Sequence, residues 1–428
     1  MSSLSPAAAM LTKVNLVFGS TRLRATTVAI ADPGPLERFL PLGEPGCAFI
    51  RKDEGFVGIG ELARFETDYI ETADVWWAEV SQMIDHDSEL PGVSGVGPLA
   101  VGSFAFDPDR SALGSVLTVP EVIIGRRGGR CWLTQLGDKR DFTLPEPSEP
   151  PAFPALRLGR GSVTQDEWAG LVARCVEQIH AGRVHKVVLA RDLIAESNLP
   201  IDLRAILHQL IDRYPMTWTY LVDGLVGATP ELLVRVSGGL VTSRVLAGTI
   251  SVDPSQTDPL AKAAELARSQ KDLVEHEYAV NSVAEALSPF CRAMNVPEAP
   301  SVLPLPNVLH LATDITGVAD EDASSLRLAA ALHPSAAVCG TPTHLAAETI
   351  AAVEGMDRGR YAGPVGWVDA AGDGEWAIAL RGGYCDPSSP EKIRLFAGAG
   401  IVADSQPAAE LDETRAKFLP MLQALGLD

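Results

Sequence analysis

Two pairs of carboxylates, each with a spacing of three residues, are the feature of this sequence best suited to chemistry. Asp272 and Glu275 form the first pair, and Glu410 and Glu413 form the second. Side chains at i and i+3 share one face of a helix, so each helix can present two carboxylates to one point. Four carboxylates in one cleft would repel one another without a hard dication such as Mg²⁺, which takes oxygen ligands. The alternative is two solvated helix faces, and the spacing alone fits both.

Two lysines and one further glutamate are additional candidates. Lys417 follows Glu413 by four residues, either within the same site or as a surface Glu–Lys pair. Lys186 lies in the apolar run VHKVVLAR, where burial would lower its pKa and favour a base. An edge strand with the ammonium reaching water is the alternative there. Glu231 follows Pro230 in GATPELLV, as a buried carboxylic acid or as a turn residue.

The elements that must position these residues are predicted from periodicity and end signals. Thr164 and Glu167 form a capping-box pattern, which predicts a helix that ends at Gly182. Apolar residues at seven-residue steps predict one long helix over 259–287, and a last helix runs from about 405 to 425. Runs of β-type residues predict strands at 184–191, 217–222, 232–236, 376–384 and 393–401. Strands and helices do not alternate regularly, so the fold class is α+β.

The first part of the chain is different in character. Residues 1–150 combine short β-type runs with turns and one helix candidate near 74–84. A proline-rich segment over 144–154 cannot continue a helix or a central strand, so we predict a linker there. This segment separates 1–150 from 151–428.

Composition excludes several classes of protein. The 428 residues are 46% hydrophobic and carry a net charge of −20, which suits a large core and opposes binding to nucleic acid or an anionic membrane. No run of about 18 apolar residues is free of charge, glycine or proline, and MSSLSPAAAML lacks the basic region of a secretory signal. The six cysteines lie far apart without a CxxC pair. These features predict a cytoplasmic protein with reduced thiols.

An ordered set of motifs resembles the chorismate-utilising enzymes, which include isochorismate, salicylate, anthranilate and aminodeoxychorismate synthases. The resemblance covers about 157–428, while 1–150 resembles the variable N-terminal half of that family only loosely. The motifs are KVVLAR (186–191), GATPELLV (227–234), LAGT (246–249), KDLVEH (271–276), VLHLATDITG (308–317), LHPSAAVCGTP (332–342), YAGPVGW (361–367), AIALR (377–381) and AGAGIVADSQPAAELDET (397–414).

The resemblance implies one large domain of two antiparallel sheets flanked by helices, with a Mg²⁺–chorismate site in the cleft. Glu275 and Glu413 match the metal ligands, and Asp272 and Glu410 match carboxylates that act through metal-bound water. The family usually has glutamate at 272, so aspartate there is one methylene shorter. Residues that match substrate contacts are Gly248, Thr249, His310, Tyr361, Arg381, Gly398 and Lys417. A monomer is the family's usual state.

The resemblance also implies the chemistry. Lys186 matches the base that activates water, and Glu231 matches the general acid. Ammonia-using members carry glutamine at 186, and aminodeoxychorismate synthases carry lysine where this chain has Leu246. Position 337 is alanine, which resembles the isochorismate synthases; salicylate synthases are expected to have threonine at this position. We therefore expect isochorismate synthesis, for menaquinone or for a siderophore; salicylate synthesis and an inactive scaffold are the alternatives.

Overall fold

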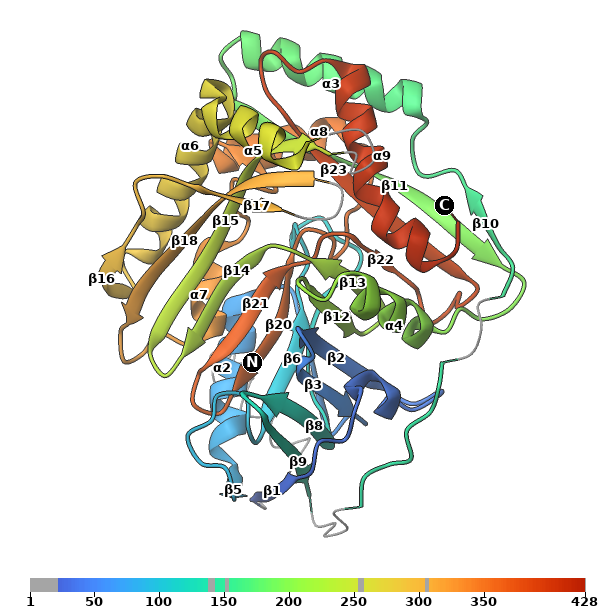
Figure 1. Ribbon diagram of the computed structural model, residues 1–428, viewed down its shortest axis with the longest axis vertical. Coiled ribbons are helices and arrows are strands. Elements are labelled where there is room, and N and C mark those ends of the chain that lie inside the picture. The colour runs from blue at the N-terminus through green and yellow to red at the C-terminus, as the bar shows by residue number, and fades with distance from the viewer. Residues whose placement is uncertain (1–21, 138–142, 151–153, 253–257, 305–307, 428) are drawn as a thin grey trace, which may run out of the picture.

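Two large β-sheets make up most of the fold, and helices cover their outer faces (Figure 1). The computed structural model describes residues 22–137, 143–150, 154–252, 258–304 and 308–427. Within these ranges one sheet has thirteen strands and the other has ten. All described pairings are antiparallel except that of β1 with β5, which is parallel. The predicted α+β class is confirmed.

The larger sheet has the order β10 (Leu156–Gly159), β11 (Lys186–Ser197), β23 (Lys392–Ile401), β22 (Gly382–Tyr384), β13 (Leu225–Thr229), β12 (Trp218–Val222), β2 (Gly46–Arg51), β3 (Glu54–Ile59), β8 (Val122–Arg127), β9 (Arg130–Leu136), β1 (Leu23–Ile30) and β5 (Ile84–Ser88), with β19 (Gly340–Thr341) beside β11. The smaller sheet has the order β16 (Cys291–Asn295), β18 (Val308–Ala319), β15 (Leu240–Ser251), β14 (Leu232–Ser237), β21 (Gly374–Ile378), β20 (Pro364–Asp369), β6 (Leu99–Ser103), β7 (Ser115–Val119) and β4 (Ala63–Thr67), with β17 (Ser301–Pro304) beside β18. Strands from before residue 150 lie in both sheets, since β2 pairs with β12 and β6 pairs with β20.

The helices divide between the two sheets. They are η1 (Leu36–Phe39), α2 (Ile70–Gln82), α3 (Gln165–His180), α4 (Leu203–Arg213), α5 (Pro259–Arg268), α6 (Gln270–Leu287), α7 (Ser325–Leu332), α8 (Thr343–Val353) and α9 (Pro407–Ala424). Helices α3, α4 and α9 pack on strands of the larger sheet, and α6 and α7 pack on the smaller sheet. The helix predicted near 74–84 is α2, and the last predicted helix is α9.

The chain crosses from one sheet to the other at two neighbouring points. Strand β13 belongs to the larger sheet and β14 to the smaller, with Pro230 and Glu231 between them. Strand β21 belongs to the smaller sheet and β22 to the larger, with 379–381 between them. The crossings are joined by hydrogen bonds, since Ile378 N donates to Glu231 O at 3.1 Å and Ala228 N donates to Arg381 O at 3.2 Å. Both Glu231 and Arg381 therefore lie between the sheets.

The prediction of one strand over 376–384 is wrong for the same reason. Arg381 has φ of 49°, a left-handed conformation that breaks the strand where the chain changes sheet. A non-glycine residue held in that conformation is strained, and such residues gather at functional sites.

The prediction of one helix over 259–287 is also wrong. Ser269 has the extended angles φ −69° and ψ 105°, so it ends α5 and begins α6. Its side chain accepts a hydrogen bond from Asp272 N, which is the N-cap arrangement of a new helix. The seven-residue apolar pattern continues across this break and conceals it. Asp272 consequently lies in the first turn of α6 and Glu275 in the second.

The capping box of α3 forms as predicted. Glu167 N donates to Thr164 Oγ1 at 3.2 Å, and Thr164 N donates to Glu167 Oε2 at 2.7 Å. All six cysteines are unpaired and buried, which confirms the expectation of free thiols. None of the helices in the described part of the chain has the length and apolar character that a membrane crossing requires. The N-terminal segment MSSLSPAAAML lies outside the described residues.

The described residues of the proline-rich segment, 144–150 and 154, lie in no helix or strand. Ser148 N donates to Arg38 O at 2.8 Å, and Arg204 Nη1 donates to Ser148 Oγ at 3.1 Å. Glu149 forms an ion pair with Arg38 at 2.9 Å. These contacts tie the predicted linker to η1 and α4.

Candidate active site

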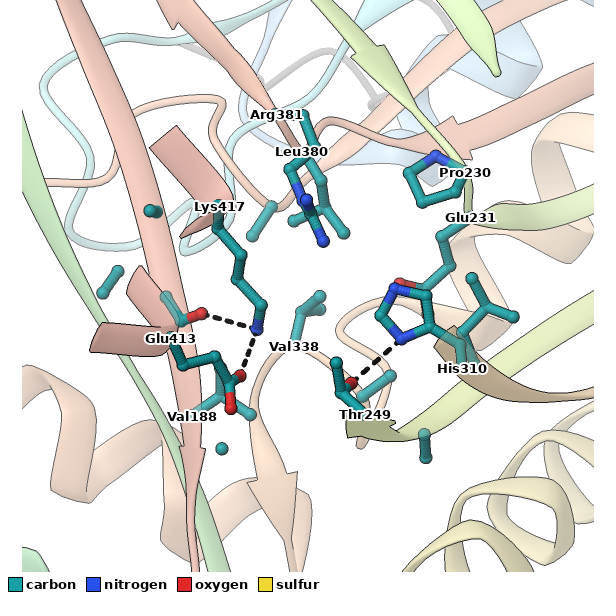
Figure 2. A pocket seen from close by; sticks show the side chains of 18 of the residues that line it. Val188, Pro230, Glu231, Thr249, His310, Val338, Leu380, Arg381, Glu413 and Lys417 are labelled. Carbon is teal, nitrogen blue, oxygen red and sulfur yellow. Dashed lines mark hydrogen bonds and ion pairs between the residues drawn. The ribbon is translucent and has the colours of Figure 1, made fainter. Parts of the chain in front are cut away.

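A cavity between the two sheets contains most of the predicted site residues. It encloses about 820 Å³ of space, including its opening to solvent. Of the predicted residues, those that line it are Lys186, Glu231, Gly248, Thr249, Glu275, His310, Tyr361, Arg381, Gly398, Glu413 and Lys417. Asp272 and Glu410 are not among its lining residues. In Figure 2, Glu413 and Lys417 face Glu231 and His310 across the cavity.

Lys186, at the start of β11, points into this cavity and is paired there. Its side chain is 12% exposed, and its Nζ lies 2.6 Å from Glu275 Oε1 on α6. The neighbouring strand β23 makes room for it with glycine, because a β-carbon at Gly400 would lie 3.0 Å from Lys186 Cε. The lysine is thus held inside the protein, and the edge-strand alternative with an ammonium in bulk water does not apply.

This close approach leads to a prediction for Gly400→Ala. The added methyl group would displace the Lys186 amine by a few tenths of an ångström, so we expect kcat to fall about tenfold. Steady-state kinetics with the substrate of the enzyme measures this. Gly114→Ala is the matched control, because the nearest atom to a β-carbon there is 4.0 Å away. Equal kcat values for the two variants would contradict the prediction.

Glu231 is the buried acid of the site. It follows Pro230 at the crossing from β13 to β14 and is 6% exposed. Burial raises its pKa to about 7, although Lys186, Lys417 and Arg381 act in the opposite direction. A carboxyl group with that pKa is half protonated near neutral pH, so it can donate a proton.

A threonine and a histidine from paired strands line the cavity close to Glu231. Thr249 on β15 lies opposite His310 on β18, and Thr249 Oγ1 is 2.9 Å from His310 Nδ1. Gly248 precedes them at a bulge with φ of 78°, which favours glycine. Burial is the main reason that the pKa of His310 falls to about 3, and the charges of Arg381 and Lys417 lower it further. The ring is therefore neutral.

The second ring nitrogen of His310 indicates a ligand site. Its Nε2 is buried and has no hydrogen-bond partner within the described residues. An unpaired buried polar atom costs free energy unless a ligand or water satisfies it. His310 therefore provides a polar contact for a molecule bound in the cavity.

Arg381 and Tyr361 add a cationic and a hydroxyl group to the same cavity. The guanidinium of Arg381 points inward in Figure 2, and burial lowers its pKa. Tyr361 is 5% exposed and stacks on Phe396 of β23, with ring centroids 4.9 Å apart. Arginine binds carboxylates with a planar pair of donors, so this part of the cavity suits an acidic ligand.

The last helix contributes a carboxylate and a lysine. Lys417 Nζ donates to Glu413 Oε1 at 2.6 Å and to Gly398 O at 2.8 Å. Glu275 and Glu413 thus enter one cavity from different helices, each beside a lysine. Carboxylate oxygens are the donors that Mg²⁺ prefers, so this pair fits that metal.

The other two predicted carboxylates lie outside the lining. Asp272 accepts a hydrogen bond from Ser269 Oγ and lies behind Gly248, where a β-carbon would be 3.0 Å from Asp272 Cβ. Glu410 is in the first turn of α9. In the described part of the chain, no three histidine, cysteine or acidic side chains form a ready-made metal cluster. The four carboxylates therefore do not converge directly on one point.

The sequence arguments missed an arginine that lines the cavity. Arg358 is buried and pairs with Glu354, with Nη2 2.6 Å from Glu354 Oε2. The spacing of four between opposite charges was the available signal, but the same spacing is common on exposed helices. Several apolar lining residues are also new: Val188, Ala190, Val338, Leu380 and Phe396.

Comparisons with known proteins agree on one family. The family described as "Chorismate binding enzyme" matches residues 47–426. Isochorismate synthase DhbC of Bacillus subtilis is 42% identical over 278 residues, which cover 61% of this chain and 68% of the relative. Isochorismate synthase MenF of Bacillus subtilis is 32% identical over 406 residues, covering 86% and 85% respectively. The solved structure of MenF, the menaquinone-specific isochorismate synthase from Escherichia coli, matches the fold with a TM-score of 0.80 at 23% identity, covering 99% of this chain and 100% of that one.

Proposed function

Because this chain belongs to the family of chorismate-binding enzymes, we propose that it is an isochorismate synthase, the activity for which its relatives DhbC and MenF are named. The observation that carries the proposal is the placement of Lys186 and Glu231 in one cavity. A base and a buried acid in one site are what the exchange of a ring hydroxyl requires.

The reaction adds a hydroxyl at one ring carbon and removes it from another. Lys186 takes a proton from water as the water oxygen bonds to ring C2. Glu231 donates its proton to the hydroxyl that leaves C4 as water, and the ring double bonds shift between the two carbons. In this structure Lys186 Nζ lies 2.6 Å from Glu275 Oε1, and the form of the side chain that takes the proton is the neutral amine. One allylic hydroxyl replaces another, so the reaction is reversible.

The remaining polar residues bind the substrate. Chorismate carries two carboxylates, and the cavity offers Thr249 Oγ1, His310 Nε2, the Tyr361 hydroxyl and the Arg381 guanidinium. Arg381 and Tyr361 bind the pyruvyl carboxylate. These contacts orient the ring, so that C2 faces the base and C4 faces the acid.

We propose Mg²⁺ as the cofactor, held by Glu275 and Glu413. When bound, this metal neutralises the ring carboxylate of the substrate and supplies Lewis-acid stabilisation. Asp272 and Glu410 do not line the cavity, so we confine their role to water-mediated contacts.

Removal of divalent metal should therefore abolish turnover. Glu275 and Glu413 would repel the ring carboxylate of the substrate unless a metal cation lay between them. We expect excess EDTA to eliminate isochorismate formation and added Mg²⁺ to restore it. Isothermal calorimetry should show chorismate binding only with Mg²⁺ present. Full activity in EDTA would refute the role of the metal.

One assay separates the candidate activities. The purified protein is incubated with chorismate and Mg²⁺, and the products are resolved by chromatography. Isochorismate alone supports the proposal. Salicylate with pyruvate would indicate a salicylate synthase, and unchanged chorismate would indicate an inactive scaffold. Ala337 lies in the cavity wall, at the position where the salicylate-forming relatives are expected to carry threonine.

We also propose that the protein works as a cytoplasmic monomer without nucleic-acid or membrane partners. The support is its acidic charge and its six free, buried thiols. Size-exclusion chromatography with light scattering should give a mass near 45.4 kDa. A mass of twice that value would contradict the monomer.

A further inference from the structure

A buried ion pair beside the cavity has no part in the mechanism above. Arg358 and Glu354 have side chains that are 3% and 1% exposed. Their contact is bidentate, with Arg358 Nε 2.7 Å from Glu354 Oε1 and Nη2 2.6 Å from Oε2. The guanidinium also lies over the Phe106 ring at 4.2 Å. Two charges buried to this degree need all their hydrogen-bonding capacity satisfied.

The pair satisfies that need through backbone groups of β11. Arg358 Nη2 donates to Val188 O at 2.7 Å, and Ala190 N donates to Glu354 Oε2 at 2.8 Å. Two strands pair with this edge of β11. Strand β19 pairs with β11 as far as Val187, and pairing with β10 starts at Ile194, so on this edge no strand pairs with the residues between them. The ion pair therefore satisfies Val188 O and Ala190 N where no neighbouring strand does, while Cys339 O and Trp168 Nε1 bond Val188 N and Ala190 O.

Lys186, Val188 and Ala190 alternate along β11 and line the cavity together. A contact that fixes the backbone at Val188 and Ala190 consequently also fixes the position from which the Lys186 side chain extends into the cavity. The same arginine donates to Val338 O at 3.1 Å through Nη1, beside Ala337 in the cavity wall.

Arg358 also contacts the segment that carries Tyr361 through its own main chain. Its carbonyl accepts a hydrogen bond from Tyr361 N at 3.0 Å. One side chain and its backbone thus connect three separate segments that line the cavity: β11, the 337–338 loop and the turn that carries Tyr361.

We propose that Arg358 and Glu354 are positioning residues for the reaction: their ion pair holds β11 so that the Lys186 amine stands at the correct distance from the substrate ring. This inference rests on the proposed function. The hydrogen bonds that the Arg358 side chain donates go to Glu354, Val188 and Val338. It therefore acts on catalysis through β11, and substrate binding does not depend on it.

The test compares Arg358→Lys with Arg360→Lys. Both arginines are buried and lie two residues apart, but Arg360 pairs with Asp223 at 2.8 Å and does not line the cavity. Lysine keeps the charge and loses the planar fork. We expect Arg358→Lys to lower kcat by 10- to 100-fold with KM for chorismate within threefold of wild type. Arg360→Lys should keep kcat within twofold.

Circular dichroism and thermal unfolding establish that each variant is folded, and Glu354→Gln replaces Arg358→Lys if the latter does not fold. Calorimetry of Mg²⁺-dependent chorismate binding should give unchanged affinity in Arg358→Lys. A wild-type kcat in Arg358→Lys, or an equal loss in Arg360→Lys, would overturn the positioning role. Absence of isochorismate formation by the wild-type protein would instead overturn the proposed function, and wild type is measured first.

Discussion

Lys186→Ala should lower kcat for isochorismate formation by about 10²- to 10⁴-fold, the range that a general base contributes. The amine is the group at the base position of the cavity, and alanine leaves nothing there to take the proton from water. Mg²⁺-dependent binding of chorismate should survive, because Thr249, His310 and Arg381 remain. A product assay by chromatography and calorimetry on the same preparation measure both quantities.

Lys392→Ala is the matched control for this variant. Lys392 begins β23, the strand beside β11, and pairs with Glu196 at 3.2 Å on the surface. Its removal should leave kcat unchanged, since exposed ion pairs contribute little. If Lys186→Ala turned over chorismate at the wild-type rate, Lys186 would have no role in activating water. If binding were lost as well, Lys186 would be a substrate contact.

Sequence reasoning succeeded where the signal is local. Thr164 and Glu167 specify the start of α3 through two hydrogen bonds within four residues, and both form. The spacing of the doublets on α6 and α9 left two interpretations open; Glu275 and Glu413 line the cavity, whereas Asp272 and Glu410 do not. The ordered motifs also identified most of the residues that line the cavity, although these residues come from strands and helices far apart in sequence.

The features that the sequence analysis did not predict depend on contacts between distant residues or on backbone conformation. Lys186 and Glu275 form an ion pair although they are 89 residues apart in sequence, and no local sequence pattern predicts such a contact. Arginine has no preference for positive φ, so Arg381 gave no sign that the chain changes sheet there. The break at Ser269 was readable, because serine three residues before an acidic residue is a helix-start pattern, but continuous apolar spacing outweighed it.

Glu231→Gln should lower kcat by a similar factor of 10² or more while the protein stays folded, because the amide keeps the shape and cannot donate the proton. Glu37→Gln is the matched control: Glu37 is 7% exposed and bonds His208 Nδ1 at 3.0 Å, away from the cavity. Full activity in Glu231→Gln would show that the proton reaching the C4 hydroxyl comes from another group.

The pH dependence provides a second, independent measurement on Glu231. The acid works only while protonated, and its pKa is about 7 in the folded protein, so kcat/KM should decline above pH 7 as it ionises.

Stability should follow the same ionisation. The folded pKa is raised above the unfolded value, so the contribution of Glu231 is fully present below the unfolded pKa near 4.5 and is lost as pH rises to about 7. Glutamine does not titrate, so the Tm of Glu231→Gln relative to wild type should increase from pH 4.5 to 7 and then stay constant. A Tm difference that does not change with pH would mean that Glu231 is ionised when buried, and the donor role would then fail together with the alkaline decline.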